Sequence, residues 1–340
     1  NIQSDFSREI FLRTIMSESI YDSNIGYQPA DPIEVPPLYF WPPKPLKILH
    51  WIFNGLLFPW GYLFIMISFL SWYYLTPDIE KMSVFEFSWI AKIWFRNAVL
   101  LMLVAGGLHW WLYIRRSQNK SYKYNSKWLA TGRKRFLWNS QVKDNMFWSI
   151  VSGCTVWTLY EAVTYWLYAS GYVKQIEWSE SPVYLTLILI GVFFWSTFHF
   201  YLNHRLLHWK PLYELAHELH HRNVNTGPWS GISMHPLEHI IYFSVFVLWW
   251  FVPVHPAIVL LTGIYQGISP SVSHSGFDKI EISRKKSINA GDQFHHLHHK
   301  YFEVNYGNTP TPMDKLFGTW HDGTPEAHKE IKVRLRPEQY

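Results

Sequence analysis

Apolar residues gather into long runs separated by polar stretches, and the lengths of these runs predict membrane-spanning helices. A helix needs about 20 mostly apolar residues to cross the hydrocarbon core of a bilayer. Four runs reach or approach that length, at residues 48–75, 89–114, 146–170 and 183–200. The pattern therefore predicts an all-α, polytopic membrane bundle with about four spans.

A fifth apolar run, residues 239–269, contains Pro253 and Pro256 in its middle. Proline has no N–H to donate, and its ring clashes with the preceding turn of a helix. The residue before each proline is also biased away from helical angles. We therefore expect a bent or re-entrant helical pair here rather than a fifth straight span.

Charged and aromatic residues near the ends of the runs fit a membrane boundary. Lys92 and Arg96 lie near the start of the second run, where long basic side chains are expected to extend towards the headgroups. Several of the 20 Trp residues lie near the predicted span ends, among them Trp51, Trp72 and Trp110. Indole rings favour the membrane interface, although packing in a protein core explains any single Trp equally well.

The composition supports a membrane protein, and the charges predict its orientation. Aromatic residues make up 19% of the 340 positions and charged residues only 16%, unlike an ordinary soluble chain. Between Arg115 and Lys143 stand nine Lys or Arg residues and no acidic residue, which marks a cytoplasmic loop by the positive-inside rule. No nucleic-acid module accompanies these charges, so anionic lipid contact or topology explains them better.

Two spans separate the basic loop from the histidine-rich segment that follows residue 200, so both should lie on the cytoplasmic side. The short connection between the third and fourth spans carries Lys174, Glu177 and Glu180 and should lie on the opposite side. We therefore predict that Lys120 and Lys300 face the cytoplasm, whereas Lys174 faces away from it.

The same pattern divides the chain into four parts. We expect a polar, Pro-rich cytoplasmic arm at 1–45 without a signal-peptide pattern, the first two spans and the basic loop at 46–143, a histidine-rich domain at 144–325, and a polar tail at 326–340. Cys154 is the only cysteine and lies within a predicted span. It excludes an intrachain disulfide and a metal site built from cysteines.

Histidines recur at helical spacing between residues 201 and 300. One His-x-x-x-His and two His-x-x-His-His boxes contain His204, His208, His217, His220, His221, His295, His298 and His299. Spacings of three and four residues place the imidazoles on one face of a helix, where they can converge on one point. With 18 His residues in the chain, a given His-x-x-His-His arises by chance about once in several thousand positions. Two copies therefore indicate a metal site.

Eight box histidines exceed the roughly four ligands that one tetrahedral zinc ion takes, so two metal ions are the economical interpretation. Neutral imidazole suits iron, zinc, copper and nickel, and the spacing does not choose among them. The alternative is a titrating patch of histidines without metal, which is the usual interpretation of any single histidine taken alone.

The boxes and three further segments resemble the fatty acid hydroxylase and sterol desaturase superfamily over residues 145–325. These segments are His235-Pro236-Leu237-Glu238, His274-Ser275-Gly276-Phe277-Asp278, and Asn305-Tyr306-Gly307 followed by Asp314–Thr319. The resemblance implies a membrane bundle with a cytoplasmic, histidine-rich helical cap that holds two irons. It also implies hydroxylation or desaturation of a lipid or sterol with O2 and two electrons. The last of the three segments is more similar to sterol-modifying and bacterial branches than to fatty acid 2-hydroxylases.

The resemblance extends the metal ligands from eight to ten, adding His274 and His235, with no catalytic residue beyond the ligands. His239, one helical turn after His235, and Asp278 are the alternatives to His235. Asp278 and Glu238 are also candidates for accepting the second N–H of a ligand imidazole, with an ordinary solvated acid as an equal alternative. His296 would point about 100° away from His295 on a helix and is not expected to bind metal.

Iron is the metal that the resemblance implies, with zinc possible in purified material. The sequence contains no His-Pro-Gly-Gly haem loop of a fused cytochrome b5. A separate cytochrome b5-like protein, ferredoxin or reductase is therefore expected to supply the electrons. The competing function is a zinc-binding membrane protein or metal transporter without oxidative activity, but transport favours ligands inside the spans. A bis-histidine haem would leave most of the boxes unexplained.

Overall fold

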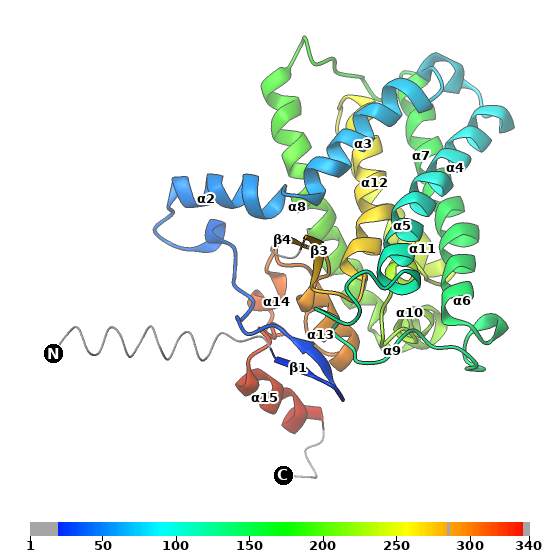
Figure 1. The fold of residues 1–340 in the computed structure, drawn as a ribbon. Helices are drawn as coiled ribbons and strands as arrows, with labels where there is room; N and C mark the ends of the chain where they lie inside the picture. The colour runs from blue at the N-terminus through cyan, green and yellow to red at the C-terminus, as the bar shows by residue number, and fades with distance from the viewer. Residues whose placement is uncertain (1–19, 284–285, 336–340) are drawn as a thin grey trace.

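The computed structural model describes residues 20–283 and 286–335, and this part of the chain is mainly helical (Figure 1). The α-helices are α2 (Pro45–Trp51), α3 (Trp60–Leu75), α4 (Phe87–Leu101), α5 (Gly107–His109), α6 (Gln141–Phe147), α7 (Cys154–Ala169), α8 (Pro182–Leu207), α9 (Lys210–Leu212), α10 (Glu218–His221), α11 (Pro236–Phe243), α12 (Pro256–Ser273), α13 (Gln293–Tyr301), α14 (Met313–Leu316) and α15 (Pro325–Leu335). The last of these forms within the tail that was expected only to be polar.

Short turns of π- or 3-10 helix continue or connect several of these helices. The π-helical turns are η2 (Ile52–Leu56), η4 (Met102–Gly106), η5 (Trp110–Ile114), η7 (Trp148–Gly153) and η8 (Tyr213–His217). The 3-10 turns are η1 (Pro37–Tyr39), η3 (Ile79–Ser83), η6 (Leu137–Asn139), η9 (Pro228–Ser230) and η10 (Ser244–Trp250).

Two small antiparallel hairpins correct the expectation of an all-α fold. One pairs β1 (Ile20–Asp22) with β2 (Gly26–Gln28), and the other pairs β3 (Lys279–Ser283) with β4 (Lys286–Asn289). The first hairpin lies in the predicted irregular arm, whose residues 1–19 fall outside the described residues. Strands of three to five residues carry too little alternation of apolar and polar positions to be recognised in the sequence.

Two helices are long and apolar enough to cross a membrane, Phe87–Ile114 and Pro182–Leu207, and they match the second and fourth predicted spans. The first predicted span is not straight, because the helix Pro45–Leu56 and the helix Trp60–Leu75 meet at 66°. Figure 1 shows α2 leaving the bundle sideways. Pro59 lies at the break, where its missing N–H removes a helical hydrogen bond. The described residues thus contain two candidate spans, or three if the bent pair counts as one.

The third and fifth apolar runs form helices that are not both long enough and apolar enough to be candidate spans. The helix at 141–169 contains the charged residues Lys143, Asp144 and Glu161. The fifth run is broken at residues 251–255, between η10 and α12, as its two prolines predict. Most of α12 is buried, and it packs against α3, α7 and α8. The bundle is therefore organised around α12 as a central helix.

Two glycines let α12 approach α7 closely. A Cβ on Gly263 would lie 2.4 Å from the indole nitrogen of Trp157, and a Cβ on Gly267 would lie 2.6 Å from the same ring. Real Cβ atoms do not approach so closely, and the Trp157 side chain is fully buried and cannot move aside. Glycine at these two positions is required for the contact.

Arg96 does not extend towards the headgroups, which corrects the expectation from the sequence. It is buried and pairs with Glu161 on α7. Its guanidinium also donates to Thr76 Oγ1 at 2.7 Å, and Asn97 Nδ2 donates to Glu161 Oε2 at 3.0 Å. A charge buried in an apolar bundle needs a partner of opposite sign, and Glu161 supplies it. The pair joins α4 to α7.

The basic segment at 115–143 is a packed layer rather than a free loop. Tyr124 N donates to Gly276 O at 3.0 Å, and Asp278 N donates to Tyr122 O at 2.8 Å. Lys123 is fully buried, and its ammonium donates to Asn125 O and Asn225 Oδ1. These contacts tie the segment to the region that carries the histidine boxes.

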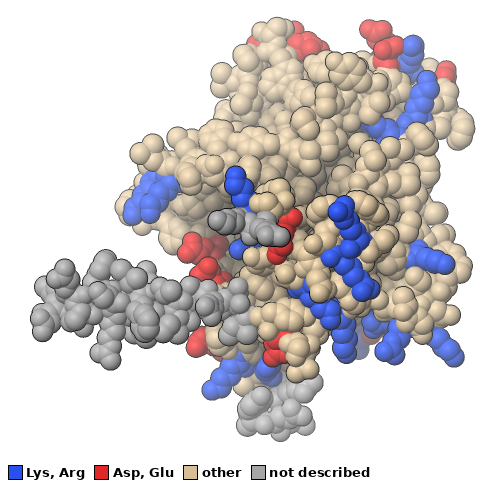
Figure 2. Space-filling model, viewed as in Figure 1, with Lys and Arg blue, Asp and Glu red and all other residues tan. Residues whose placement is uncertain are grey.

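Charged side chains are distributed unevenly over the surface. Figure 2 shows Lys and Arg gathered mainly over the lower half of the molecule, and a second charged group at the top of the bundle. Between them the bundle surface is largely uncharged. The connection between α7 and α8, which carries Lys174, lies at the top in Figure 1, whereas α10 and α13, which carry histidines, lie in the lower half. This distribution is typical of a protein with an apolar middle layer.

Candidate metal centre

Nine of the ten sequence-predicted ligands come together in two groups of buried or half-buried rings. The five-histidine cluster contains His204, His208, His217, His221 and His298, and the four-histidine cluster contains His220, His274, His295 and His299. Within each cluster the candidate ligand nitrogens all lie within 4.8 Å of one another. Residues from distant parts of the chain therefore converge on two points.

Each His-x-x-His-His box contributes to both clusters, because neighbouring residues on a helix point about 100° apart. In the second box, at η8 and α10, His221 joins the five-histidine cluster and its neighbour His220 joins the other. On α13, His298 and His299 are divided in the same way. The doubled histidine at the end of each box is thus what places two clusters side by side.

Three nitrogens of the five-histidine cluster form an equilateral triangle. The Nε2 atoms of His208, His221 and His298 lie 3.1 Å from one another in every pair. Imidazole nitrogens bind metals at about 2.0–2.1 Å, so two ligands about 95° apart on one ion are separated by roughly 3.1 Å. The spacing of these three nitrogens fits a single metal ion.

The four-histidine cluster contains a similar triangle. The Nε2 atoms of His274 and His295 lie 3.0 Å apart, and each lies 3.2 Å from Nε2 of His299. The fourth ring, His220, packs against His274 and His299 with ring centroids 5.3 and 4.8 Å away. A second ion fits here by the same argument.

Hydrogen bonds at Nδ1 orient several of these rings. The pairs are His204 with Tyr306 O at 2.6 Å, His217 with Glu238 Oε1 at 2.7 Å, His274 with Pro270 O at 3.0 Å, and His298 with Val304 O at 2.7 Å. A carbonyl oxygen only accepts, so Nδ1 carries the hydrogen and Nε2 presents its lone pair. Partners of this kind are characteristic of metal-bound histidines.

Two of these lone pairs have no protein partner. The Nε2 atoms of His204 and His217 are buried and without a hydrogen bond among the described residues. Burying an unpaired polar atom costs free energy, commonly about 1–3 kcal/mol. A cation at the five-histidine cluster would remove that cost.

Burial keeps the rings neutral, as metal binding requires. It lowers the pKa of His208 to about 3 and the pKa of His220 to about 4. Burial also raises the pKa of Glu238 and lowers the pKa of His217. A cation at His217 Nε2 would favour the carboxylate form of Glu238.

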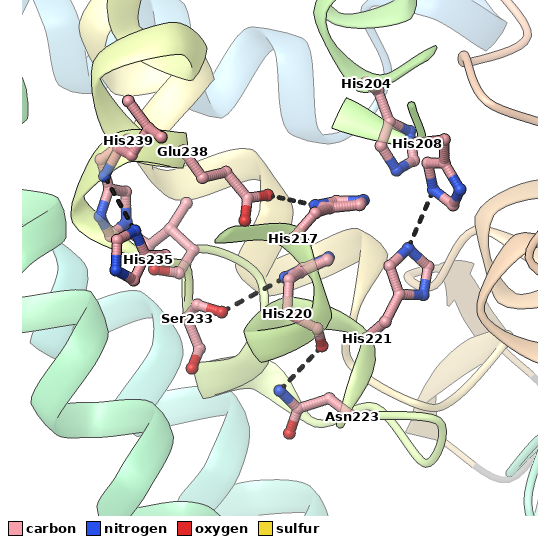
Figure 3. Close-up of polar contacts among 12 residues, drawn as sticks. His204, His208, His217, His220, His221, Asn223, Ser233, His235, Glu238 and His239 are labelled. Carbon is pink, nitrogen blue, oxygen red and sulfur yellow. Dashed lines mark hydrogen bonds and ion pairs between the residues drawn. The ribbon is translucent and has the colours of Figure 1, made fainter. Parts of the chain in front are cut away.

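The structure does not place His235 in either cluster, so a tenth ligand at this position stays a prediction from the sequence. Its Nδ1 accepts a hydrogen bond from Leu237 N at 3.2 Å, which caps α11, and its ring is only half-buried. Figure 3 shows His235 and His239 beyond Glu238, away from His208 and His221. A histidine followed by proline at the start of a helix has this capping role available without any metal.

The two alternatives to His235 also have other partners. His239 Nδ1 lies 2.9 Å from Ser152 Oγ and its Nε2 lies 3.0 Å from Ile232 O, so both ring nitrogens are occupied. Asp278 accepts from the Tyr124 hydroxyl at 2.8 Å. His296 stacks on the Tyr124 ring with centroids 4.5 Å apart and lies outside both clusters, as its position on the helix predicts.

The sequence interpretation missed the role of Val304 and Tyr306. Their carbonyls orient two ligands, and their geometry depends on Asn305, which has a positive φ of 54°. The Asn305 side chain donates to Phe294 O at 3.0 Å and His321 O at 2.9 Å, which fixes the turn. Asparagine tolerates this left-handed conformation, so the Asn-Tyr-Gly motif was the available signal.

Comparison with known proteins agrees with this geometry. The fatty acid hydroxylase family profile matches residues 188–319. Methylsterol monooxygenase 1 of Gallus gallus is 31% identical over 47% of this chain and 55% of its own length. A Delta(7)-sterol 5(6)-desaturase of Eremothecium gossypii is 28% identical over 41% of this chain and 39% of its own length. A Delta(7)-sterol-C5(6)-desaturase of Nicotiana tabacum is 26% identical over 70% of this chain and 86% of its own length.

Residues 188–319 are therefore similar to the fatty acid hydroxylase and sterol desaturase superfamily. The chain spans 55% and 39% of the length of the first two of these relatives. No solved structure is significantly similar to it. The matched segment begins within α8 and ends after α14, so every histidine of both clusters lies inside the fatty acid hydroxylase region.

A cavity of about 270 Å³ adjoins the four-histidine cluster. His220, His274 and His295 line one side of it, and Gly55 and Trp60 line it at the break between η2 and α3. Aromatic residues such as Phe64 and Phe200 form much of the remaining wall. No residue of the five-histidine cluster lines this cavity. The two clusters therefore differ in their surroundings, because histidines of the four-histidine cluster line this cavity and those of the five-histidine cluster do not.

Proposed function

We propose that this protein is a membrane-bound di-iron oxygenase that hydroxylates or desaturates a lipid, and that the lipid is a sterol. The observation that carries the proposal is the pairing of two imidazole clusters, one of which borders a largely apolar cavity. The names of the relatives support the sterol, because they are a methylsterol monooxygenase and two sterol desaturases.

Oxidation of a lipid C–H bond suits a site whose converging side chains are imidazoles. An unactivated C–H bond has no polar group to attack, and bound iron would supply the oxidant. Hydroxylation converts R–H, O2, two electrons and two protons into R–OH and water. Desaturation uses the same inputs to convert –CH2–CH2– into –CH=CH– and two waters. The electrons come from a separate cytochrome b5-like protein, ferredoxin or reductase.

The residues of this chain bind the metals, orient the ligands and keep the site dry. The nine clustered histidines hold the two ions, and Glu238 with the carbonyls of Val304, Tyr306 and Pro270 fixes their rings. The cavity walls exclude bulk water and position one carbon beside the four-histidine cluster. The break between η2 and α3 gives a lipid a lateral way in, since Gly55 and Trp60 lie at both the break and the cavity.

The metal centre is placed on the cytoplasmic side in this proposal. The support is that the basic segment packs directly on the histidine-rich region, through Tyr124 N to Gly276 O and Asp278 N to Tyr122 O. In a background with Cys154→Ser, single cysteines at Lys120 and Lys300 should be labelled from the cytoplasm and one at Lys174 from the other side. Labelling of Lys120 and Lys300 from opposite sides would refute this orientation.

Reconstitution tests the reaction. Protein loaded with iron and placed in lipid nanodiscs with a cytochrome b5-type or ferredoxin-type electron donor is given a Δ7-sterol or a 4-methylsterol under O2. We expect products that differ in mass by +16 or −2 and do not form under argon. Two equivalents of metal per chain with no oxidised product from any sterol, fatty acyl or alkane substrate would favour the zinc-protein alternative instead.

A further inference from the structure

The cavity beside the four-histidine cluster is lined by one acidic side chain and by no lysine or arginine. Among the residues that line it are several hydroxyl and amide side chains, but neither Lys nor Arg. Asp292 is its only acidic residue. Apart from a metal ion at the histidines, the described residues that line the cavity therefore include a strong hydrogen-bond acceptor, Asp292, and no cationic side chain.

Asp292 lies immediately beside two candidate ligands. Its backbone N–H donates to Ser273 O at 3.2 Å, next to His274, and it precedes His295 by three residues. Its carboxylate accepts from the backbone N–H groups of Phe294, at 2.9 Å, and of His295, and so caps α13. Among the described residues no side chain is hydrogen-bonded to its carboxylate. One carboxylate can accept about four hydrogen bonds, so the Asp292 carboxylate can accept a further hydrogen bond from a molecule in the cavity.

Ser196 is a second polar group without a partner. Its side chain is only 1% exposed, and Oγ has no hydrogen bond among the described residues. The next residue, Thr197, donates to the carbonyl of Phe193 one turn back, which is the usual arrangement in a helix. Ser196 lines the cavity instead. A buried hydroxyl that makes no bond within the protein points to a polar group of a ligand.

We propose that the cavity binds a neutral, hydroxyl-bearing lipid, whose O–H donates to Asp292, and that Asp292 selects it over lipids that lack the hydroxyl. This inference rests on the proposed function and names the recognition residue for its substrate. A hydrogen bond to a charged group contributes about 1.5–3 kcal/mol, which is roughly a 10- to 100-fold difference in affinity. A fatty acid carboxylate would instead face a like charge with no basic side chain to offset it.

Binding of three probes to metal-loaded protein in nanodiscs tests the proposal without requiring turnover. The probes are a radiolabelled Δ7-sterol, its 3-deoxy analogue and a long-chain fatty acid. We expect the sterol to bind roughly 10- to 100-fold tighter than the deoxy analogue, and the fatty acid to bind more weakly than the sterol. Equal affinity for the sterol and its deoxy analogue, or tightest binding of the fatty acid, overturns the proposal.

Asp292→Asn separates recognition from helix capping. Asparagine caps helices as well as aspartate, but with its oxygen on the helix it turns an amide donor towards the cavity. We expect sterol affinity to fall to that of the deoxy analogue, whose own affinity does not change. Asp322→Asn is the matched control, since Asp322 also accepts from the backbone two residues on, at Thr324, and does not line the cavity. Equal losses for both sterol probes in Asp292→Asn would assign Asp292 to capping alone.

Two further measurements keep the outcome decisive. Metal content reports whether Asp292→Asn still assembles its clusters, and Asp292→Ser, which retains a capping oxygen, replaces it if it does not. Ser196→Ala should weaken sterol binding less than Asp292→Asn while retaining two metal ions. A hydroxyl-dependent affinity without any oxidised product would leave the recognition site intact and refute the proposed oxygenase function. Oxidation of the sterol without hydroxyl-dependent affinity would support the oxygenase function and refute the role of Asp292 in recognition.

Discussion

The helical bundle and the histidine clusters both bury polar groups, but they satisfy them differently. In the bundle, Arg96, Glu161, Asn97 and Thr158 bond to one another, and none of their side-chain atoms is left buried and unpaired. In the clusters, nine histidines converge with their Nε2 atoms facing one another, and those of His204 and His217 have no protein partner.

This difference separates a structural network from a binding site. A network that is complete within the protein lowers the free energy of the fold by its own contacts, and a ligand has nothing to add. Lone pairs that converge without a proton to share are destabilising until a cation binds them. The bundle network therefore stabilises the fold by itself, whereas the clusters would stabilise it once a cation is bound.

The largest expected effect comes from breaking a cluster. His298→Ala removes a corner of the triangle in the five-histidine cluster, so we expect bound metal to fall from two equivalents to about one and turnover to fall to background. Elemental analysis and the sterol oxidation assay measure the two effects. Membrane insertion should be unchanged, because His298 lies outside the candidate spans. Wild-type turnover in this variant would remove His298 from the site, and His295→Ala tests the other cluster in the same way.

Breaking the bundle network should cost stability and leave the metals bound. Glu161→Gln leaves the buried Arg96 without a counter-charge, which costs about 3–5 kcal/mol in the free energy of unfolding. Denaturation in detergent measures it, with the exposed Glu180→Gln as control. The double variant Arg96→Met with Glu161→Leu should recover most of the loss. Unchanged stability in Glu161→Gln would show that the pair is not coupled to folding.

A smaller effect is expected when only the orientation of a ligand changes. Glu238→Gln keeps an oxygen for His217 Nδ1 but removes the charge that a bound cation favours. Metal affinity of the five-histidine cluster should fall by about 10- to 100-fold, with the four-histidine cluster unaffected. Competition with a chelator measures both sites in one titration. Equal loss at both clusters would indicate a general destabilisation instead.

The smallest effect is expected at a histidine that belongs to a box but not to a cluster. His296→Ala removes a ring that stacks on Tyr124, so we expect two metals per chain and most of the turnover to remain. A melting temperature a few degrees lower is expected from the lost ring contact, which is worth about 1 kcal/mol. Loss of metal comparable with that of His295→Ala would contradict the assignment of ligands within the box.

The sequence by itself determined the class of the protein and most of its candidate ligands. Runs of apolar residues indicate helices that are buried or that span a membrane, and His-x-x-His-His indicates histidines on one face of a helix. Both patterns can be recognised in the sequence because they depend on spacing within one element. This is why the second and fourth apolar helices, the break in the fifth run and the nine histidines that converge in two clusters could be predicted. The exclusion of His296 followed from the same 100° rotation per residue.

Only the tertiary structure decided how these elements meet. The bend at Pro59, the pairing of Arg96 with Glu161 and the capping role of His235 depend on contacts between residues far apart or on local backbone geometry that spacing does not encode. The division of nine histidines into a cluster beside a cavity and a cluster away from it depends on the packing of α8, α10, α12 and α13 together. Periodicity shows which face a side chain occupies, whereas the partner across that face is fixed by the close packing of the whole core.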